Sequence, residues 1–143
     1  MSELIYLDNA ATTKVAPEVY EAMNPYFQEY YGNAASVYRF AGESKKAVEN
    51  ARKEVADFLG AKPNEIYFTG GGSESDNWAL KGLAFALRNK GKHIITSAIE
   101  HHAILHTCEY LEKLGYEITY VGVDENGILK LDELEKEIRE DTI

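Results

Sequence analysis

Short apolar runs alternate with amphipathic stretches of helical length from residue 66 onwards, and this alternation limits the folds open to the chain. The runs typical of strands are 66–69, 94–97 and 118–121, and each is followed by a stretch with apolar residues at helical spacing. Repeated strand–helix units predict an α/β fold, a three-layer arrangement of mainly parallel strands with helices on both faces. Thr142–Ile143 is predicted to begin one more strand.

Residues 1–65 lack this alternation and are predicted to hold two helices. After an extended start at 5–7, Pro17 marks the first turn of a short helix that closes at the turn 30–33. The apolar positions of the second helix are Ala47, Ala51, Val55, Phe58 and Leu59. Gly60 follows this helix as its expected C-terminal cap.

The charge balance and the termini exclude several classes of partner. The net charge is −9, so a basic surface for nucleic acid is not expected. Residues 1–4 lack the basic start of a secretory leader, and no later stretch is long and apolar enough to span a bilayer. One cysteine, Cys108, can form neither an internal disulfide nor a cysteine-based metal cluster. We therefore expect a cytoplasmic protein that binds neither nucleic acid nor membrane.

A glycine-rich turn lies between the first predicted strand and its helix, at Gly70-Gly71-Gly72-Ser73. Glycines let the backbone approach an anion, Ser73 is a good helix N-cap, and the helix start presents free N–H groups. Neither the P-loop nor the dinucleotide-binding spacing is present, which favours a single phosphate monoester. The alternative is that the glycines only make a tight turn and Ser73 only caps the helix.

Histidines follow the next predicted strand. His101 is expected at the carboxyl edge of the sheet, where open α/β sheets bind ligands, and could stack on a flat cofactor and exchange protons there. The alternative is that His101 only caps or packs at the start of a helix. His102 and His106 share a helix face, but no third ligand is near and no metal site is predicted. Cys108 is expected to be a buried small hydrophobe rather than a nucleophile.

Four ordered segments resemble the NifS-type cysteine desulfurases, within the class V, fold-type I aminotransferase group. These segments are Tyr6 to Thr13, Gly32 to Ser36, Phe68 to Gly82 and Thr96 to His101, and the similarity continues to Ile143. The resemblance implies a pyridoxal 5'-phosphate enzyme that moves sulfur from L-cysteine to an enzyme cysteine as a persulfide and releases L-alanine.

The resemblance also implies roles for individual residues. Gly72 and Ser73 take the phosphate-binding positions, and His101 takes the position of the histidine that stacks on the pyridine ring and assists proton transfer. The segment 8–11 resembles the family's N-terminal stretch near the entrance of the active site.

This sequence departs from the family pattern in two places. Ala34, Tyr38 and Ala41 stand where the family usually has Pro, His and Gly, so one wall of the site is expected to differ. In the phosphate motif, Gly71-Gly72-Ser73 replaces the commoner Gly-Ala-Thr, which keeps a small backbone and a hydroxyl.

By the same resemblance, residues 1–34 are part of the family's small domain, and residues 35–143 are the N-terminal portion of the large cofactor-binding domain. Family members continue to an asparagine and an arginine at the site, an aspartate that pairs with the pyridine nitrogen, the Schiff-base lysine and the catalytic cysteine. None of these is assigned here, so the chain alone is expected to have little or no desulfurase activity.

The expected partners are L-cysteine, a second copy of the chain in a homodimer, and a sulfur-acceptor or Fe–S scaffold protein. Two alternatives stay open. One is a selenocysteine lyase or another class V enzyme, and the other is a non-catalytic fragment that binds a phosphate ligand or a partner subunit.

Overall fold

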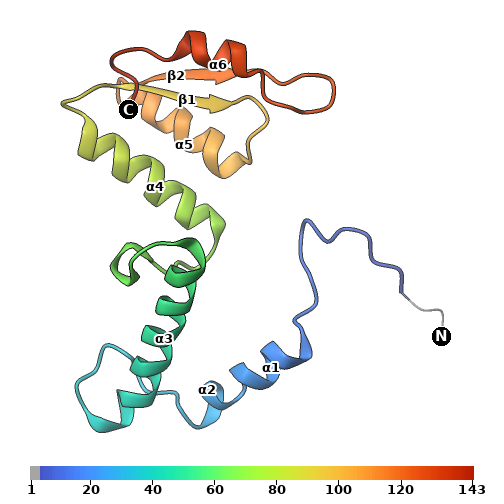
Figure 1. Cartoon of the computed structure of the whole chain (residues 1–143), viewed down its shortest axis with the longest axis vertical. Helices are drawn as coiled ribbons and strands as arrows, with labels where there is room; N and C mark the ends of the chain where they lie inside the picture. The colour runs from blue at the N-terminus through green and yellow to red at the C-terminus, as the bar shows by residue number, and fades with distance from the viewer. Residues whose placement is uncertain (1–3) are drawn as a thin grey trace. The chain divides into compact units, whose positions relative to one another are not determined.

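A computed structural model describes residues 4–143, which form two compact units that divide between Tyr67 and Phe68 (Figure 1). Residues 1–3 belong to the expected 1–34 segment and to the start that was predicted not to be a secretory leader, and they lie outside the described residues. The elements of the first unit are α1 (Pro17–Met23), α2 (Pro25–Gln28), η1 (Arg39–Ala41), α3 (Gly42–Leu59) and η2 (Pro63–Glu65). A domain boundary after residue 34 stays a prediction.

The short helix predicted from Pro17 is present but divided. α1 ends at Met23, and α2 begins at Pro25, with Asn24 alone between the two helices. Proline has no N–H to continue the helical bonding pattern, so a single helix through this position is disfavoured. Residues 5–7 belong to no helix or strand, and the segment 30–33 is the predicted irregular connection.

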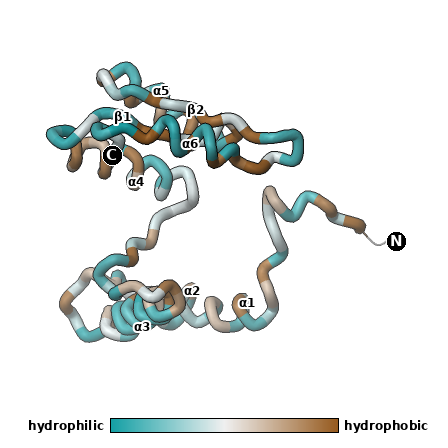
Figure 2. The backbone as a smooth tube through the Cα atoms, turned by 45° about the horizontal axis from the view of Figure 1, so that its top comes forward, coloured by the Kyte–Doolittle hydropathy of each residue, from teal (hydrophilic) through white to brown (hydrophobic). Residues whose placement is uncertain are grey.

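The second predicted helix is confirmed as α3, which is mostly hydrophilic with interspersed apolar positions (Figure 2). Gly60 caps its C-terminus with a left-handed φ of 66°, and the Ala61 N–H donates to the Ala56 carbonyl at 2.9 Å. Glycine adopts this conformation without steric cost, which explains the end of the helix. Of the predicted apolar face, Phe58 and Leu59 are exposed, whereas the neighbouring Ala56 is buried.

The strand predicted at 66–69 is wrong as a paired element. Ile66 has extended dihedral angles, φ −100° and ψ 127°, but residues 66–69 are not assigned to any strand. The local apolar pattern therefore predicted the extended backbone at Ile66, but not a place in a sheet. A strand also needs ladder hydrogen bonds to a neighbouring strand, which spacing along the chain does not report.

The second unit confirms the rest of the predicted alternation. Its elements are α4 (Gly72–Leu87), β1 (His93–Ser97), α5 (His102–Lys113), β2 (Glu117–Val121) and α6 (Leu131–Glu137). β1 and β2 pair in parallel, with Ile94 opposite Ile118. Such pairing needs a crossover, and α5 supplies it.

A small core forms where α4 and α5 cover one face of this sheet. Ala84, Leu111 and Tyr116 are buried there, and partly buried hydrophobic residues pack around them: Leu80, Ile94, Ile118 and Ile143. The Tyr116 hydroxyl donates to the Ala84 carbonyl at 2.7 Å, which satisfies a buried phenol. The packing holds the N-terminal end of α4 near that of α5.

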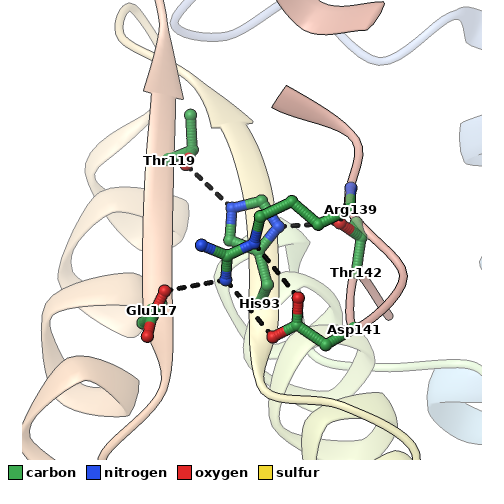
Figure 3. A network of polar contacts seen from close by, with 6 residues as sticks. All are labelled: His93, Glu117, Thr119, Arg139, Asp141 and Thr142. Carbon is green, nitrogen blue, oxygen red and sulfur yellow. Dashed lines mark hydrogen bonds and ion pairs between the residues drawn. The ribbon is translucent and has the colours of Figure 1, made fainter. Parts of the chain in front are cut away.

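The C-terminal residues lie along the free side of β1. His93 forms a parallel bridge with Thr142, and the Ile143 N–H donates to the His93 carbonyl at 2.9 Å. The strand expected at Thr142–Ile143 is therefore present as a single bridge. The His93 side chain lies on the sheet face opposite to Ile94, where it contacts Thr119 and Thr142 (Figure 3).

Among residues 4–143, no helix combines the length and the apolar character that a bilayer crossing requires.

Candidate functional site

The glycine-rich turn leads directly into α4, but the predicted cap is wrong. Gly71 is the N-cap, and Ser73 is the second residue of the helix rather than its cap. Gly71 has extended dihedral angles, φ 162° and ψ 173°, so the helical backbone begins at Gly72. A Ser73 cap would place the first helical residue at Glu74, and the observed helix begins two residues earlier, at Gly72.

Side chains from the first turn of α4 close the glycine-rich turn. A Glu74 carboxylate oxygen accepts the Gly70 N–H at 2.6 Å, and the Thr69 and Ser75 hydroxyls lie 2.6 Å apart. Glu74 is the third residue of the helix, where a glutamate commonly reaches back to an amide before it. The four-residue spacing between Gly70 and Glu74 is visible in the sequence, but the sequence analysis predicted no contact between them.

The start of α4 suits an anion. The first N–H groups of a helix have no acceptor within the helix, and the dipole places partial positive charge there. A Cβ atom built on Gly71 or Gly72 would meet nothing within 4 Å, so the space beside these two glycines is open. The donor set is therefore the one that binds phosphate groups at helix N-termini.

His101 is the N-cap of α5. Its Nδ1 accepts the Ala103 N–H at 3.1 Å, so the capping role that was the simpler alternative is present. An Nδ1 that accepts a hydrogen bond carries no proton, which assigns the proton of the neutral ring to Nε2. The cap thus sets which nitrogen can donate.

Ser73 and His101 line the same open hollow, which has a volume of about 480 Å³ and lies between α4 and α5. The other residues that line it are Asn77, Lys81, His102, Ala103, His106, Thr107 and Tyr110. The structure therefore brings together the serine and the histidine that the sequence analysis selected. Asn77, Lys81 and Tyr110 also line the hollow, and the sequence analysis did not select them. Their four-residue spacing from Ser73 and His106 is the signal that could have indicated this.

The polar groups on the α4 side of the hollow are bonded in series. Lys81 Nζ donates to Asn77 Oδ1 at 2.6 Å, and Asn77 Nδ2 donates to the Ser73 carbonyl at 2.9 Å. Lys81 Nζ also lies 4.7 Å from the centroid of the Tyr110 ring on α5. These contacts join the two helices along the hollow.

The histidine pair and the cysteine of α5 differ in exposure. The His102 and His106 rings are stacked with centroids 5.2 Å apart, and within residues 4–143 no three possible metal ligands gather at one place.

Cys108 is buried, as predicted. Burial raises the pKa of the Cys108 thiol, and the nearby carboxylates of Glu112 and Glu100 raise it further. A thiol held protonated is a poor nucleophile.

The segment 8–11 belongs to the first unit. It forms a turn in which the Ala11 N–H donates to the Asp8 carbonyl at 3.1 Å, and its residues are exposed. Its expected place near the entrance of an active site stays a prediction.

Comparison with known proteins gives a consistent family. Residues 5–143 match the family described as Aminotransferase class-V. The chain is 59% identical to "Cysteine desulfurase IscS" of Methanosarcina thermophila over 142 residues, which is 99% of this chain and 35% of that protein. It is 54% identical to "Cysteine desulfurase IscS" of Dictyoglomus turgidum over 143 residues, which is 100% of this chain and 36% of that protein.

Solved structures show the same likeness. A protein named "NIFS-LIKE PROTEIN" superposes with a TM-score of 0.92 at 44% identity, covering 97% of this chain and 38% of that one. The structure named "SspA in complex with cysteine" has a TM-score of 0.89 at 41% identity, covering 96% of this chain and 40% of that one. These likenesses confirm the predicted α/β fold class, of which the chain carries a part.

The chain spans about a third of the length of the curated relatives that it matches, 35% in the first of them. Its resemblance to the NifS-type desulfurases, inferred from four motifs, is confirmed by the family match and by these relatives. The chain belongs to the class-V aminotransferase family.

Proposed function

We propose that these residues are the N-terminal part of a pyridoxal-phosphate-dependent cysteine desulfurase. The observation that carries the proposal is that Ser73 and His101 line one hollow, at the start of two adjacent helices. Relatives named cysteine desulfurase match this chain over nearly its whole length. The substrate proposed for the whole protein is L-cysteine, since the structural relative SspA is named as a complex with cysteine.

The start of α4 fits the phosphate group of this cofactor. The backbone N–H groups of Gly72 and Ser73 would bind the phosphate oxygens, and the helix dipole favours their negative charge. The Ser73 hydroxyl adds a further donor on the wall of the hollow. Gly71 and Gly72 leave room for the phosphate to approach the backbone, because a Cβ atom on either would meet nothing within 4 Å.

His101 fits the ring of the cofactor. Its imidazole lies on the same hollow, and with Nδ1 committed to the Ala103 N–H, Nε2 is the nitrogen that holds the exchangeable proton. A flat ring in the hollow could stack on the imidazole, which would orient the ring and shield it from water. Pyridoxal phosphate, when bound, supplies an electron sink for the substrate amine.

The proposed overall reaction breaks the carbon–sulfur bond of L-cysteine and forms a sulfur–sulfur bond with an enzyme thiol. Cysteine and the thiol together give alanine and a persulfide, so all atoms are accounted for. Cys108 does not suit the thiol role, because it is buried and its pKa is raised. The cysteine, the Schiff-base lysine and the aspartate for the pyridine nitrogen are expected elsewhere in the whole protein, and the 143 residues alone should have little activity.

For the whole protein we further propose a cytoplasmic homodimer that passes sulfur to an acceptor or Fe–S scaffold protein. A polypeptide that joins these residues to the remaining part of a relative should release one alanine for each sulfur transferred from L-cysteine. Preference for L-selenocysteine would favour a selenocysteine lyase instead. Phosphate binding without alanine release would favour a non-catalytic role.

The phosphate role is tested by removing one backbone donor. Gly72→Pro deletes the N–H at the first helical position, where proline is otherwise tolerated, and Gly72→Ala is the matched control. Affinity for pyridoxal phosphate, measured by ³¹P NMR titration, should fall roughly tenfold for Gly72→Pro, since a hydrogen bond to a charged group contributes about 1.5 kcal/mol or more. It should hardly change for Gly72→Ala. Equal affinities for both variants would contradict the phosphate role.

The ring role of His101 is separated from its capping role by two substitutions. His101→Asn keeps an N-cap acceptor and loses the ring, while His101→Phe keeps an aromatic face and loses the acceptor. We expect weaker cofactor binding for His101→Asn and a lower thermal stability for His101→Phe. If affinity instead follows the loss of the cap, His101 is a structural residue only.

A further inference from the structure

Two rows of side chains face each other across the hollow. Ser73, Asn77 and Lys81 are spaced by four residues on α4, and His102, His106 and Tyr110 are spaced by four on α5. Residues four apart lie on one helix face, so each row runs down its helix from the N-terminal end. The proposed phosphate and ring contacts lie at the N-terminal ends of the two rows.

Lys81 is the point at which the rows are joined. Its ammonium lies 4.7 Å from the Tyr110 ring centroid, within the range of a cation–π contact, and donates to Asn77 at 2.6 Å. No carboxylate of the described residues forms an ion pair with it. The aromatic ring and the amide oxygen are therefore its principal partners in this part of the chain.

Asn77 carries the restraint from Lys81 to the top of α4. Its Nδ2 donates to the Ser73 carbonyl, the residue whose own N–H is a proposed phosphate donor. Ser73 and Lys81 are eight positions apart, which is about 12 Å along a helix. The contact of Lys81 with Tyr110, about two helical turns from Ser73, can thus restrain the orientation of the first turn of α4.

We propose that Lys81 is a positioning residue: through Tyr110 and Asn77 it fixes the separation between the phosphate-binding start of α4 and His101 at the start of α5. This inference rests on the proposed function, because the separation matters only for a ligand that contacts both helices. Pyridoxal phosphate is such a ligand, since its phosphate would bind α4 and its ring would stack on His101. Inorganic phosphate would contact only the α4 side.

The test compares these two ligands on the 143-residue chain. Lys81→Met keeps the aliphatic stem and removes the charge and the donor, whereas Lys81→Arg keeps a cation that stacks well on aromatic rings. We expect Lys81→Met to raise the dissociation constant of pyridoxal phosphate roughly fivefold. The dissociation constant of inorganic phosphate should stay unchanged, and Lys81→Arg should restore most of the cofactor affinity.

Tyr110→Leu provides a second, independent variant. If Lys81 acts through the ring, the double variant Lys81→Met with Tyr110→Leu should bind pyridoxal phosphate no more weakly than Lys81→Met alone. Lys45→Met, which removes an exposed lysine of the first unit, is the charge-matched control. Far-UV circular dichroism of every variant establishes that the helices are retained.

A proportional loss of inorganic phosphate affinity would overturn the proposal, because Lys81 would then contact the anion directly. Additive effects in the double variant would overturn it as well. Failure of the proposed function looks different: neither Gly72→Pro nor His101→Asn would then change cofactor affinity. If those two variants weaken binding and Lys81→Met does not, the positioning role alone is wrong.

Discussion

Nδ1 of His93 lies 2.7 Å from the Thr142 hydroxyl oxygen, although the two residues are 49 positions apart in the sequence. The other ring nitrogen, Nε2, lies 2.8 Å from the Thr119 hydroxyl on β2. The buried imidazole therefore joins three segments of the second unit: β1, β2 and the C-terminal residues (Figure 3). Arg139 lies beside it and pairs with Glu117 at 2.7 Å and Asp141 at 3.1 Å.

Replacing His93 should destabilise the second unit. His93→Leu removes the hydrogen bonds of the imidazole to the Thr119 and Thr142 hydroxyls, although Thr142 Oγ1 still accepts the Arg139 N–H at 2.8 Å. The loss should cost about 1–3 kcal/mol of unfolding free energy. Urea denaturation followed by circular dichroism measures the change. His106→Gln, a change at an exposed histidine, is the control and should have little effect on stability. A loss for His93→Leu no larger than for the control would contradict the role of the imidazole.

Gly91 should tolerate no side chain. A Cβ atom there would lie 2.0 Å from the Asp141 carbonyl oxygen, so Gly91→Ala must displace the C-terminal residues. The amides of His93 and Ile143, which donate to Asp141 and His93 respectively, should then exchange faster with solvent. Hydrogen exchange by NMR measures this, and Gly42→Ala, where a Cβ meets nothing within 4 Å, should leave both amides protected.

Asp124 should titrate at unusually low pH. Hydrogen bonds from the backbone N–H groups of Ile128 and Asn126 lower the pKa of its carboxyl below 3.8. The ionised form is thus favoured in the folded state, and the stability that it contributes is present above pH 3.8 and is lost as the pH falls through the lower, folded pKa. A ¹³C NMR titration should place the midpoint below 3.8, and Asp124→Asn should remove this part of the acid dependence. A midpoint at or above that value would contradict the two hydrogen bonds.

Cys108 should be unreactive in the folded protein. Burial raises the pKa of its thiol above 9.0, so the thiolate is scarce near neutral pH and shielded from reagents. The folded state keeps this proton longer than the unfolded state does, so the stability contributed by the protonated thiol falls as the pH rises from 9.0 towards the folded pKa. An aromatic disulfide reagent should label Cys108 only after denaturant is added. Rapid labelling of the native protein would show that the thiol is accessible.

The sequence by itself predicted the features that depend on neighbours along the chain. The alternation after residue 66 predicted α4, β1, α5, β2 and α6, because a helix or strand face is recorded in its own spacing of apolar residues. Gly60 was predicted as a cap because its conformation is a local property. The motifs around Gly72 and His101 indicated the family, which the comparisons confirm.

Tertiary structure decided what depends on groups far apart in the sequence. Pairing of residues 66–69 depends on a neighbouring strand, and the contacts of His93 with Thr142 and of Lys81 with Tyr110 depend on how helices and strands pack. Spacing along a chain sets which face a residue occupies but not what the opposite face presents. For this reason the sequence predicted Ser73 and His101 as partners, and the packing of α4 against α5 decided that they share one hollow.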